Sequence, residues 1–273
     1  MWPLERQRSV LRVGRHRVEL WRSASQGLVM HESRDFDGAG ASEPGELERC
    51  LAHLLRGDVL GATRSARQVD VVLESAWLPV MGFGVGASPT TRGRVEALLK
   101  HYMGDLHEPR EAFELRLEHR TGDRQALGYA LAPAVKRAAL AQVVAAGLQA
   151  ASVQPSFAWA WSRLARHRRG LRSGWWVWSE QDRSLVAQWQ RGRVVTLNAG
   201  AEPLEAEADI ARAVATEAAR QGQLQDLQIV HAGWSAGESW PDAQFRLIRA
   251  HVAAPIASSP TSAMAAAKLA GAA

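Results

Sequence analysis

Short runs of alternating or continuous apolar residues recur along the chain, and such runs between polar turns are typical of strands. The alternation from Val10 to Leu20 and the run from Leu28 to Met30 predict an N-terminal β-hairpin that turns near residues 25–27. Further strands are expected over residues 69–73, 113–118, 127–131, 148–154, 175–178, 185–189, 194–197, 227–232 and 245–252. The glycine-rich stretch VMGFGVGASPTT, residues 80–91, is expected to be a loop.

Apolar residues at helical spacing lie between many of these strands. The leucines at positions 47, 51, 54, 55 and 60 share one helical face and predict a helix over Glu46–Leu60. Four further helices are expected, over residues 91–103, 133–147, 157–167 and 204–221. Pro133 suits the start of its helix because proline is tolerated in the first turn. Strands that alternate with helices predict an α/β protein with mixed sheets.

The most aromatic segment is SGWWVWSEQDRSLVAQWQRGRVV, residues 173–195, which is predicted to contain a hairpin with a polar turn. Strand alternation places Trp175 and Val177 on one face, and Trp176 and Trp178 on the other. Because both faces are apolar, we expect this strand to lie in the centre of a packed sheet.

Composition and charge narrow the classes of function. An apolar fraction of 47% is enough for a core, and the net charge of +5 comes from arginines mixed with acidic residues, which disfavours nucleic acid as a partner. Cys50 is the only cysteine, so no disulfide within the chain or cysteine-based metal site is expected. The nine histidines show no metal-ligand spacing, and no metal site is predicted. Without a signal peptide or a long apolar segment, the chain is expected to be soluble and cytoplasmic.

A longer pattern appears in GYALAPAVKRAALAQVVAAGLQAASVQPSFAWAWSRL, residues 128–164. A helix leads to Gly147-Leu148, a strand ends in Val153 and Pro155, and a second helix precedes the tryptophan hairpin. Over residues 69–234 this order resembles PilM and the cytoplasmic part of GspL, which are actin-like proteins of type IV pilus and type II secretion assembly. The resemblance implies an actin-like (RNase H-like) α/β fold, with mixed sheets flanked by helices in two reduced lobes.

The resemblance and the changes in composition also suggest how the chain is divided. We expect an N-terminal β-hairpin (1–35), a linker and helix (36–68), a first α/β lobe (69–172), a second, truncated lobe (173–252) and a disordered tail (253–273). The tail is expected to be disordered because its sequence is a low-complexity run of alanine, serine and proline.

In nucleotide-binding proteins of this superfamily, the hairpin turn and a glycine after a later strand hold the nucleotide. The resemblance places the remnant of that site at Ser179, Asp182, Ser184 and Gly233. Here the turn lacks the glycine that lets a backbone approach phosphate, and it carries Glu180 where phosphate charge would lie. We therefore expect a degenerate nucleotide site and no cofactor. The alternative left open is an actin-like protein that binds ATP with magnesium.

A second alternative is a serine hydrolase. The motif Gly233-Trp234-Ser235-Ala236-Gly237 matches the Gly-x-Ser-x-Gly pattern of hydrolases, with a predicted strand before it, and Ser235 would be the nucleophile. The partners that normally follow such a serine are reduced here to Asp242 and His251, which are only nine residues apart. This spacing disfavours the hydrolase.

The favoured function is therefore a non-enzymatic cytoplasmic scaffold of a type IV pilus or type II secretion-like assembly. It would hold the cytoplasmic segment of an inner-membrane protein at a sheet edge or in a groove between lobes, and so lie peripherally at that membrane. The basic run RLARHRRGLR, residues 163–172, is read either as a solvated helix end or as a contact surface. The predicted partner-contact residues are Arg166, Arg168, Arg169, Gln181, Asp182 and Arg183. A homodimer is left open.

Overall fold

The computed structural model describes residues 9–24, 27–36, 44–55, 68–86, 91–106, 114–119, 125–167, 173–200, 202–222, 226–233, 239–240 and 246–251. The elements in this part of the chain are β1 (Ser9–Val13), β2 (Arg17–Ala24), β3 (Gly27–Asp35), α1 (Pro44–Leu54), β4 (Gln68–Leu73), β5 (Val80–Gly84), α2 (Arg92–Leu106), β6 (Glu114–Glu118), β7 (Gln125–Leu131), α3 (Pro133–Ala145), β8 (Gln149–Pro155), α4 (Ser156–His167), β9 (Ser173–Ser179), β10 (Ser184–Gln190), β11 (Arg193–Ala199), α5 (Glu207–Arg220), β12 (Asp226–Gly233), β13 (Ser239–Trp240) and β14 (Arg246–His251). The five predicted helices and the nine strands predicted downstream of residue 68 are all present, although several of their ends are shifted.

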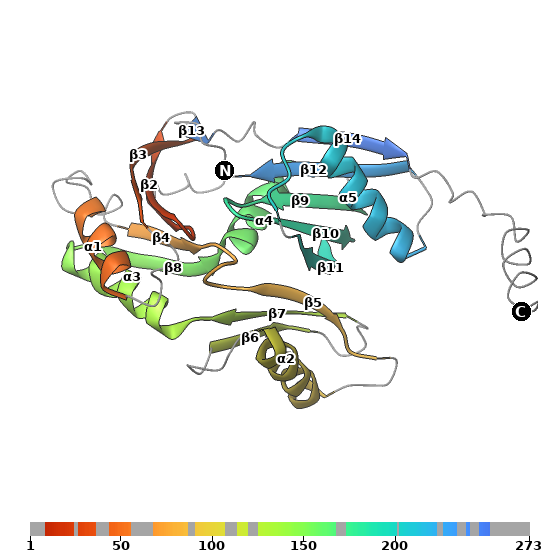
Figure 1. Ribbon diagram of the computed structural model, residues 1–273, viewed down its shortest axis with the longest axis horizontal. Coiled ribbons are helices and arrows are strands. Elements are labelled where there is room, and N and C mark those ends of the chain that lie inside the picture. Colours follow the sequence, from red (N-terminus) through yellow and green to blue (C-terminus); the bar gives the residue numbers. More distant parts are fainter. Residues whose placement is uncertain are drawn as a thin grey trace, which may run out of the picture.

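The first sheet has the strand order β13-β3-β2-β1-β4-β8, with β1, β4 and β8 parallel to one another (Figure 1). It joins the N-terminal strands to β4 and β8. The predicted turn between β2 and β3 is confirmed, since Ala24 pairs with Gly27. The expectation of one alternation over Val10–Leu20 was wrong. A tight turn at residues 14–16 divides it into the antiparallel strands β1 and β2, and this turn is too short to interrupt the apolar pattern.

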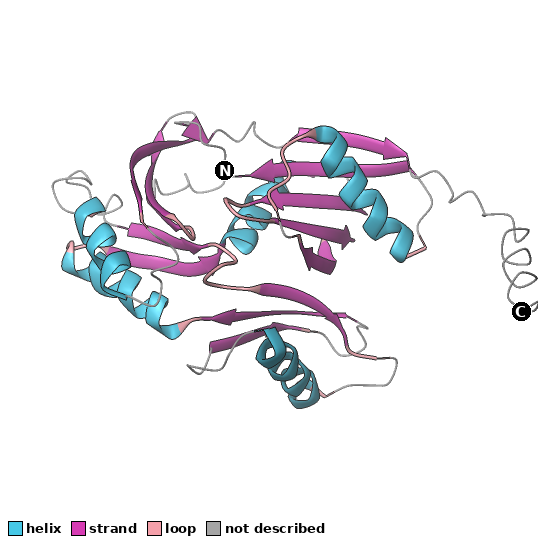
Figure 2. Cartoon of the chain, viewed as in Figure 1, coloured by secondary structure: helices cyan, strands magenta, loops and turns pink. Residues whose placement is uncertain are grey.

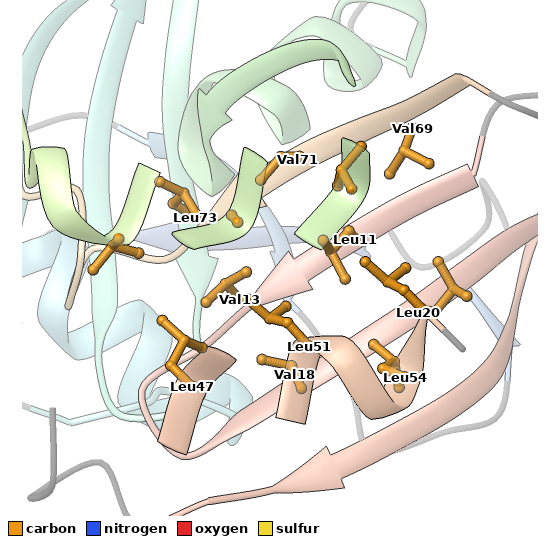
Figure 3. Close-up of a cluster of buried hydrophobic side chains, with 14 of the residues drawn as sticks. Leu11, Val13, Val18, Leu20, Leu47, Leu51, Leu54, Val69, Val71 and Leu73 are labelled. Atoms are coloured by element: carbon orange, nitrogen blue, oxygen red, sulfur yellow. The ribbon is translucent and has the colours of Figure 1, made fainter. Parts of the chain in front are cut away.

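One face of this sheet packs against α1 and α3. Figure 3 shows the apolar side chains that meet there, among them Leu11 of β1, Leu20 of β2, Val71 of β4 and Leu51 of α1. All four side chains are completely buried. Helix α1 is observed to Leu54, and the end of its predicted range lies outside the described residues, as does the predicted tail 253–273.

The second sheet has the order β11-β10-β9-β12-β14, and β9 lies at its centre, as the two-sided aromatic pattern predicted. Trp175 and Val177 pack against α5, and Trp176 and Trp178 point to the opposite face. That second face meets α4, where the ring centroids of Phe157 and Trp176 are 4.5 Å apart. Because this core also contains side chains of the first sheet, α4 is enclosed between the two large sheets (Figure 2).

The third sheet, of order β5-β7-β6, packs against α2. Its strand β5 corrects the expectation of a loop over residues 80–91. Val80 and Phe83 are buried in the strand, while a Cβ atom on Gly82 would lie only 2.8 Å from the backbone nitrogen of Leu197. Gly82 is therefore needed for the close approach of β5 to β11. In the sequence alone, a glycine at this position indicates a loop. No helix in the described ranges is long and apolar enough to cross a membrane.

Candidate functional site

Two turns from different sheets meet near the start of α4. The β1–β2 turn contributes Gly14 and Arg15, and the β9–β10 turn contributes residues 180–183. Arg15 Nη1 lies 3.4 Å from Asp182 Oδ2. A Cβ atom on Gly14 would lie 2.9 Å from Glu74 Oε2 and 3.1 Å from Gln181 Oε1, so a larger residue would not fit between these two acceptors. We refer to this contact region between the two turns as the cleft.

A buried ion network lies beside these two turns. Arg12 donates through Nε, at 2.8 Å, and through Nη2 to Glu74 Oε1, and through Nη1, also at 2.8 Å, to Glu19 Oε2. Trp21 donates its indole N–H to the same Glu19 oxygen at 2.8 Å. Although burial opposes ionisation of Arg12, the charges of Glu74 and Glu19 raise the pKa of its guanidinium above the ordinary value. These side chains join β1, β2 and the end of β4.

Glu180 extends from the β9–β10 turn into this network and is only 2% exposed. Its Oε2 accepts the backbone N–H of Ser75 at 2.9 Å, and its Oε1 is hydrogen-bonded to Ser156 Oγ. Trp178 also donates to Ser156 Oγ, at 3.1 Å. Burial, together with the nearby charge of Glu74, raises the pKa of Glu180 to about 7, against the opposing effect of these hydrogen bonds. Glu180 thus links the second sheet to the β4–β5 connection and to the first residue of α4.

The predicted remnant residues Ser179, Ser184 and Gly233 do come together. Ser179 Oγ lies 2.6 Å from the Leu204 carbonyl oxygen and 3.0 Å from Ser184 Oγ, and Ser184 Oγ accepts the Leu204 N–H at 2.7 Å. Since a carbonyl can only accept, the Ser179 hydroxyl donates to it, and Ser184 donates to Ser179. His231 Nε2, 3.2 Å from Ser179 Oγ, is then also a donor.

This closed network directs both hydroxyls to the chain itself. A Cβ atom on Gly233 would lie 2.9 Å from the Ser179 carbonyl oxygen, so Gly233 permits the close pairing of β12 with β9. Asp182 has a different environment, because its carboxylate contacts Arg183 and Arg15 at the edge of the cleft. The remnant residues thus occupy two separate environments.

The predicted partner-contact residues do not form one surface. Gln181, Asp182 and Arg183 lie in the cleft turn, and the buried Gln181 Oε1 points toward Gly14. Arg166 lies in the last turn of α4, ten residues beyond the helix start that contacts Glu180, which corresponds to roughly 15 Å along the axis. Arg168, Arg169 and the alternative nucleophile Ser235 lie outside the described residues.

The sequence analysis missed the residues that surround Glu180. The signal was the presence of Arg12 and Glu19 within apolar strands, since such charges are almost never buried unless they are paired. Among the described residues, no group of three or more His, Cys, Asp or Glu side chains could hold a metal ion.

A second candidate site is an open groove of about 550 Å³ between the second and third sheets. It is lined by residues 192–196 of β11 and the preceding turn, by β5 and β7, and by Phe157 and Trp161 of α4. β11 is an edge strand of its sheet, so within the described chain no strand pairs with its outer edge. Strands β5 and β7 lie beside β11, and β5 approaches it closely at Leu197, where Gly82 leaves room. We call this region the β11 groove.

Comparisons with known proteins identify the fold. No protein-family model and no curated protein matches the chain. It is similar to a Bacteroides thetaiotaomicron protein with an actin-like ATPase fold and unknown function, at 11% identity over 85% of this chain and 84% of that one, with a TM-score of 0.54. It is also similar to a chain of a PilM–PilN type IV pilus biogenesis complex, at 14% identity over 77% of this chain and 65% of that one, with a TM-score of 0.51.

A weaker likeness, with a TM-score of 0.49 and 15% identity over 87% of each chain, is to the cytoplasmic domain of EpsL, an inner membrane component of the type II secretion system of Vibrio cholerae. The predicted fold is confirmed: the chain has an actin-like α/β fold of mixed sheets flanked by helices, shared with the PilM–PilN chain. The proposed boundaries between lobes stay a prediction.

Proposed function

We propose that this chain is a non-enzymatic cytoplasmic scaffold of a type IV pilus or type II secretion-like assembly, and that it binds an extended cytoplasmic segment of an inner-membrane protein. The observation that carries the proposal is the β11 groove, where the outer edge of a sheet faces an open space of about 550 Å³. The likeness in fold to a chain of a PilM–PilN complex supports the choice of assembly.

The chemistry of the groove suits an extended peptide. An edge strand offers backbone N–H and C=O groups in the arrangement that an added strand would pair with. Beside this edge lie Val194, Val195 and the indole of Trp161, which provide apolar surface for alternate side chains of the peptide. Glu118 at the rim adds a charge that can select among peptides. A strand-like segment would thus gain both backbone hydrogen bonds and apolar burial.

The cleft supports the non-enzymatic part of the proposal. A phosphate loop needs donors that point toward the ligand, and here the hydroxyls of Ser179 and Ser184 form hydrogen bonds within the chain. Glu180, Glu74 and Glu19 place carboxyl groups where a nucleotide would bring further negative charge. We infer that the cleft has lost nucleotide binding and that the scaffold needs no cofactor.

Photo-cross-linking in the native host tests the partner. A photoreactive amino acid at Thr196, in the groove, should cross-link to the cytoplasmic segment of an inner-membrane assembly protein, and the cross-linked peptide is identified by mass. The same group at Val144, which is 69% exposed on α3, is the matched control. The proposal is wrong if both positions give the same products, or if the groove position captures only nucleic acid or metabolic enzymes.

Thermal unfolding with and without ATP and magnesium tests whether the protein binds a nucleotide. A protein that binds only in its folded form is stabilised by its ligand, and at a hundredfold excess over Kd the gain is about 2.7 kcal/mol. We expect no change in Tm with ATP. A nucleotide-dependent rise in Tm would favour the alternative of an ATP-binding actin-like protein.

A further inference from the structure

Among the described residues, the cleft contains more buried carboxyl groups than buried cations. Arg12, Glu19, Glu74 and Glu180 are each at most 3% exposed, and we call them the carboxyl cluster. The guanidinium of Arg12 is shared between Glu74 and Glu19. Those two carboxylates with one guanidinium already give a net charge of −1, and ionisation of Glu180 would make it −2 in a buried site. A buried charge without a compensating partner is strongly unfavourable.

The polar partners of Glu180 bring no compensating charge. The Ser75 backbone N–H and the Ser156 hydroxyl donate to its two oxygens, which favours ionisation, but burial and the nearby charge of Glu74 outweigh these hydrogen bonds. The second oxygen of Glu74, Oε2, and the Gln181 amide oxygen are buried and accept no hydrogen bond from the described residues. Both lie close to the position of a Gly14 Cβ atom, so the acceptors beside the turn outnumber the donors.

Four other charged groups of the described residues lie near the turn, together with the titratable His231 of β12, which contacts Ser179. Arg15 comes from the β1–β2 turn, and Asp182 and Arg183 come from the β9–β10 turn. Arg17 of β2 acts on Glu19 by its charge but is paired with Asp35 at 2.5 Å. Arg15 and Arg183 are both within 3.4 Å of the Asp182 carboxylate. Since these two cations are shared with Asp182, the guanidinium within the cluster remains that of Arg12.

We propose that Glu180 is a proton-operated latch across the cleft. In its neutral form it holds the β9–β10 turn against the β4–β5 connection and the start of α4. When it loses its proton, the excess negative charge of the carboxyl cluster releases the turn from the β4–β5 connection and from α4, while the apolar core between the two large sheets stays packed. The raised pKa of Glu180, about 7, puts this change near neutral pH.

Hydrogen–deuterium exchange read by mass spectrometry tests the latch. Protection factors, corrected for the intrinsic effect of pH, are measured for peptides that contain Ser75 and the β9–β10 turn. From about pH 6 to about pH 8, we expect protection in these peptides to fall roughly tenfold and to stay below that of α5. Equal protection of these peptides at both pH values would overturn the proposal, and so would protection equal to that of α5 at both pH values, which would indicate that the turn opens only by general unfolding.

Two variants separate the charge from the shape of the side chain. Glu180→Gln keeps a planar polar group but cannot ionise, so its turn should stay protected at both pH values. Glu48→Gln, at an exposed position on α1, should behave like the unchanged protein. The latch is wrong if Glu180→Gln shows the same pH-dependent loss. If Glu180→Gln does not fold, a pH series on the unchanged protein decides, because a flat protection profile overturns the latch.

Discussion

The cleft and the β11 groove both lie along the second sheet, yet their polar groups are used in opposite ways. In the cleft, Ser179, Ser184 and Arg12 form hydrogen bonds or ion pairs within the chain. In the groove, the outer edge of β11 pairs with no strand in the described part of the chain and faces open space. The fold alone therefore does not determine which of its surfaces can bind a ligand or a partner. Here the groups in the cleft stabilise the protein, and the groove is the surface that the scaffold proposal assigns to the partner.

The largest expected effect comes from removing the cation of the cleft. Arg12→Met leaves the buried carboxylates of Glu74 and Glu19 without their partner, and breaking a buried pair in this way costs about 3–5 kcal/mol. Urea unfolding should show this loss. Arg15→Met is the matched control, since Arg15 is 48% exposed and its side chain is 3.4 Å from Asp182, and it should change the free energy of unfolding by about 0–1 kcal/mol. A loss of similar size in both variants would mean that the cleft network does not stabilise the fold.

The second effect is the pH dependence of stability. Glu180 binds its proton more tightly in the folded chain, with a pKa of about 7 against an ordinary value of 4.5. It therefore stabilises the folded state below about pH 4.5, and this contribution is lost as the pH rises to about 7. A shift of this size corresponds to roughly 3 kcal/mol. Relative to Glu180→Gln, the unchanged protein should lose stability over that range and stay level above it.

Urea unfolding at a series of pH values measures this difference, and Glu48→Gln serves as the exposed control. Parallel curves for the unchanged protein and Glu180→Gln would contradict the assignment of the raised pKa to Glu180.

A third, smaller effect is expected at the junction that bounds the groove. Gly82→Val would place a side chain against the backbone of Leu197 and force β5 away from β11, at a cost of about 1–3 kcal/mol. Gly84→Val on the same strand is the control, because its Cβ atom would have nothing within 4 Å. Thermal unfolding compares the two variants. Equal Tm values would show that the close approach at Gly82 is not needed.

The elements of this fold could be predicted where local pattern decides the structure. The two apolar faces of Trp175–Trp178 placed β9 in the centre of a sheet, and the position of the hairpin turn beside the cleft followed from the resemblance. Strand β5 could not be predicted, because the glycine that permits its packing against β11 is locally a loop residue.

The carboxyl cluster was also beyond the sequence analysis. Arg12 and Glu74 are separated by 62 residues, and the Ser75 amide and Glu180 by 105. Only the folded chain brings them together. The serines of the predicted remnant were found, but the direction of their hydrogen bonds depends on Leu204, an apolar residue whose backbone carries no sequence signal.

The most direct test of the scaffold proposal is the recovery of the inner-membrane partner by the unchanged protein, by Val195→Arg and by Val144→Arg. Both substitutions replace a valine by arginine, but Val195 lines the groove and Val144 is exposed on α3. The cross-linked partner is quantified by mass spectrometry after Tm values confirm that all three proteins are folded. We expect Val195→Arg to lose most of the partner and Val144→Arg to retain it. Equal recovery by both variants would contradict recognition at the β11 groove.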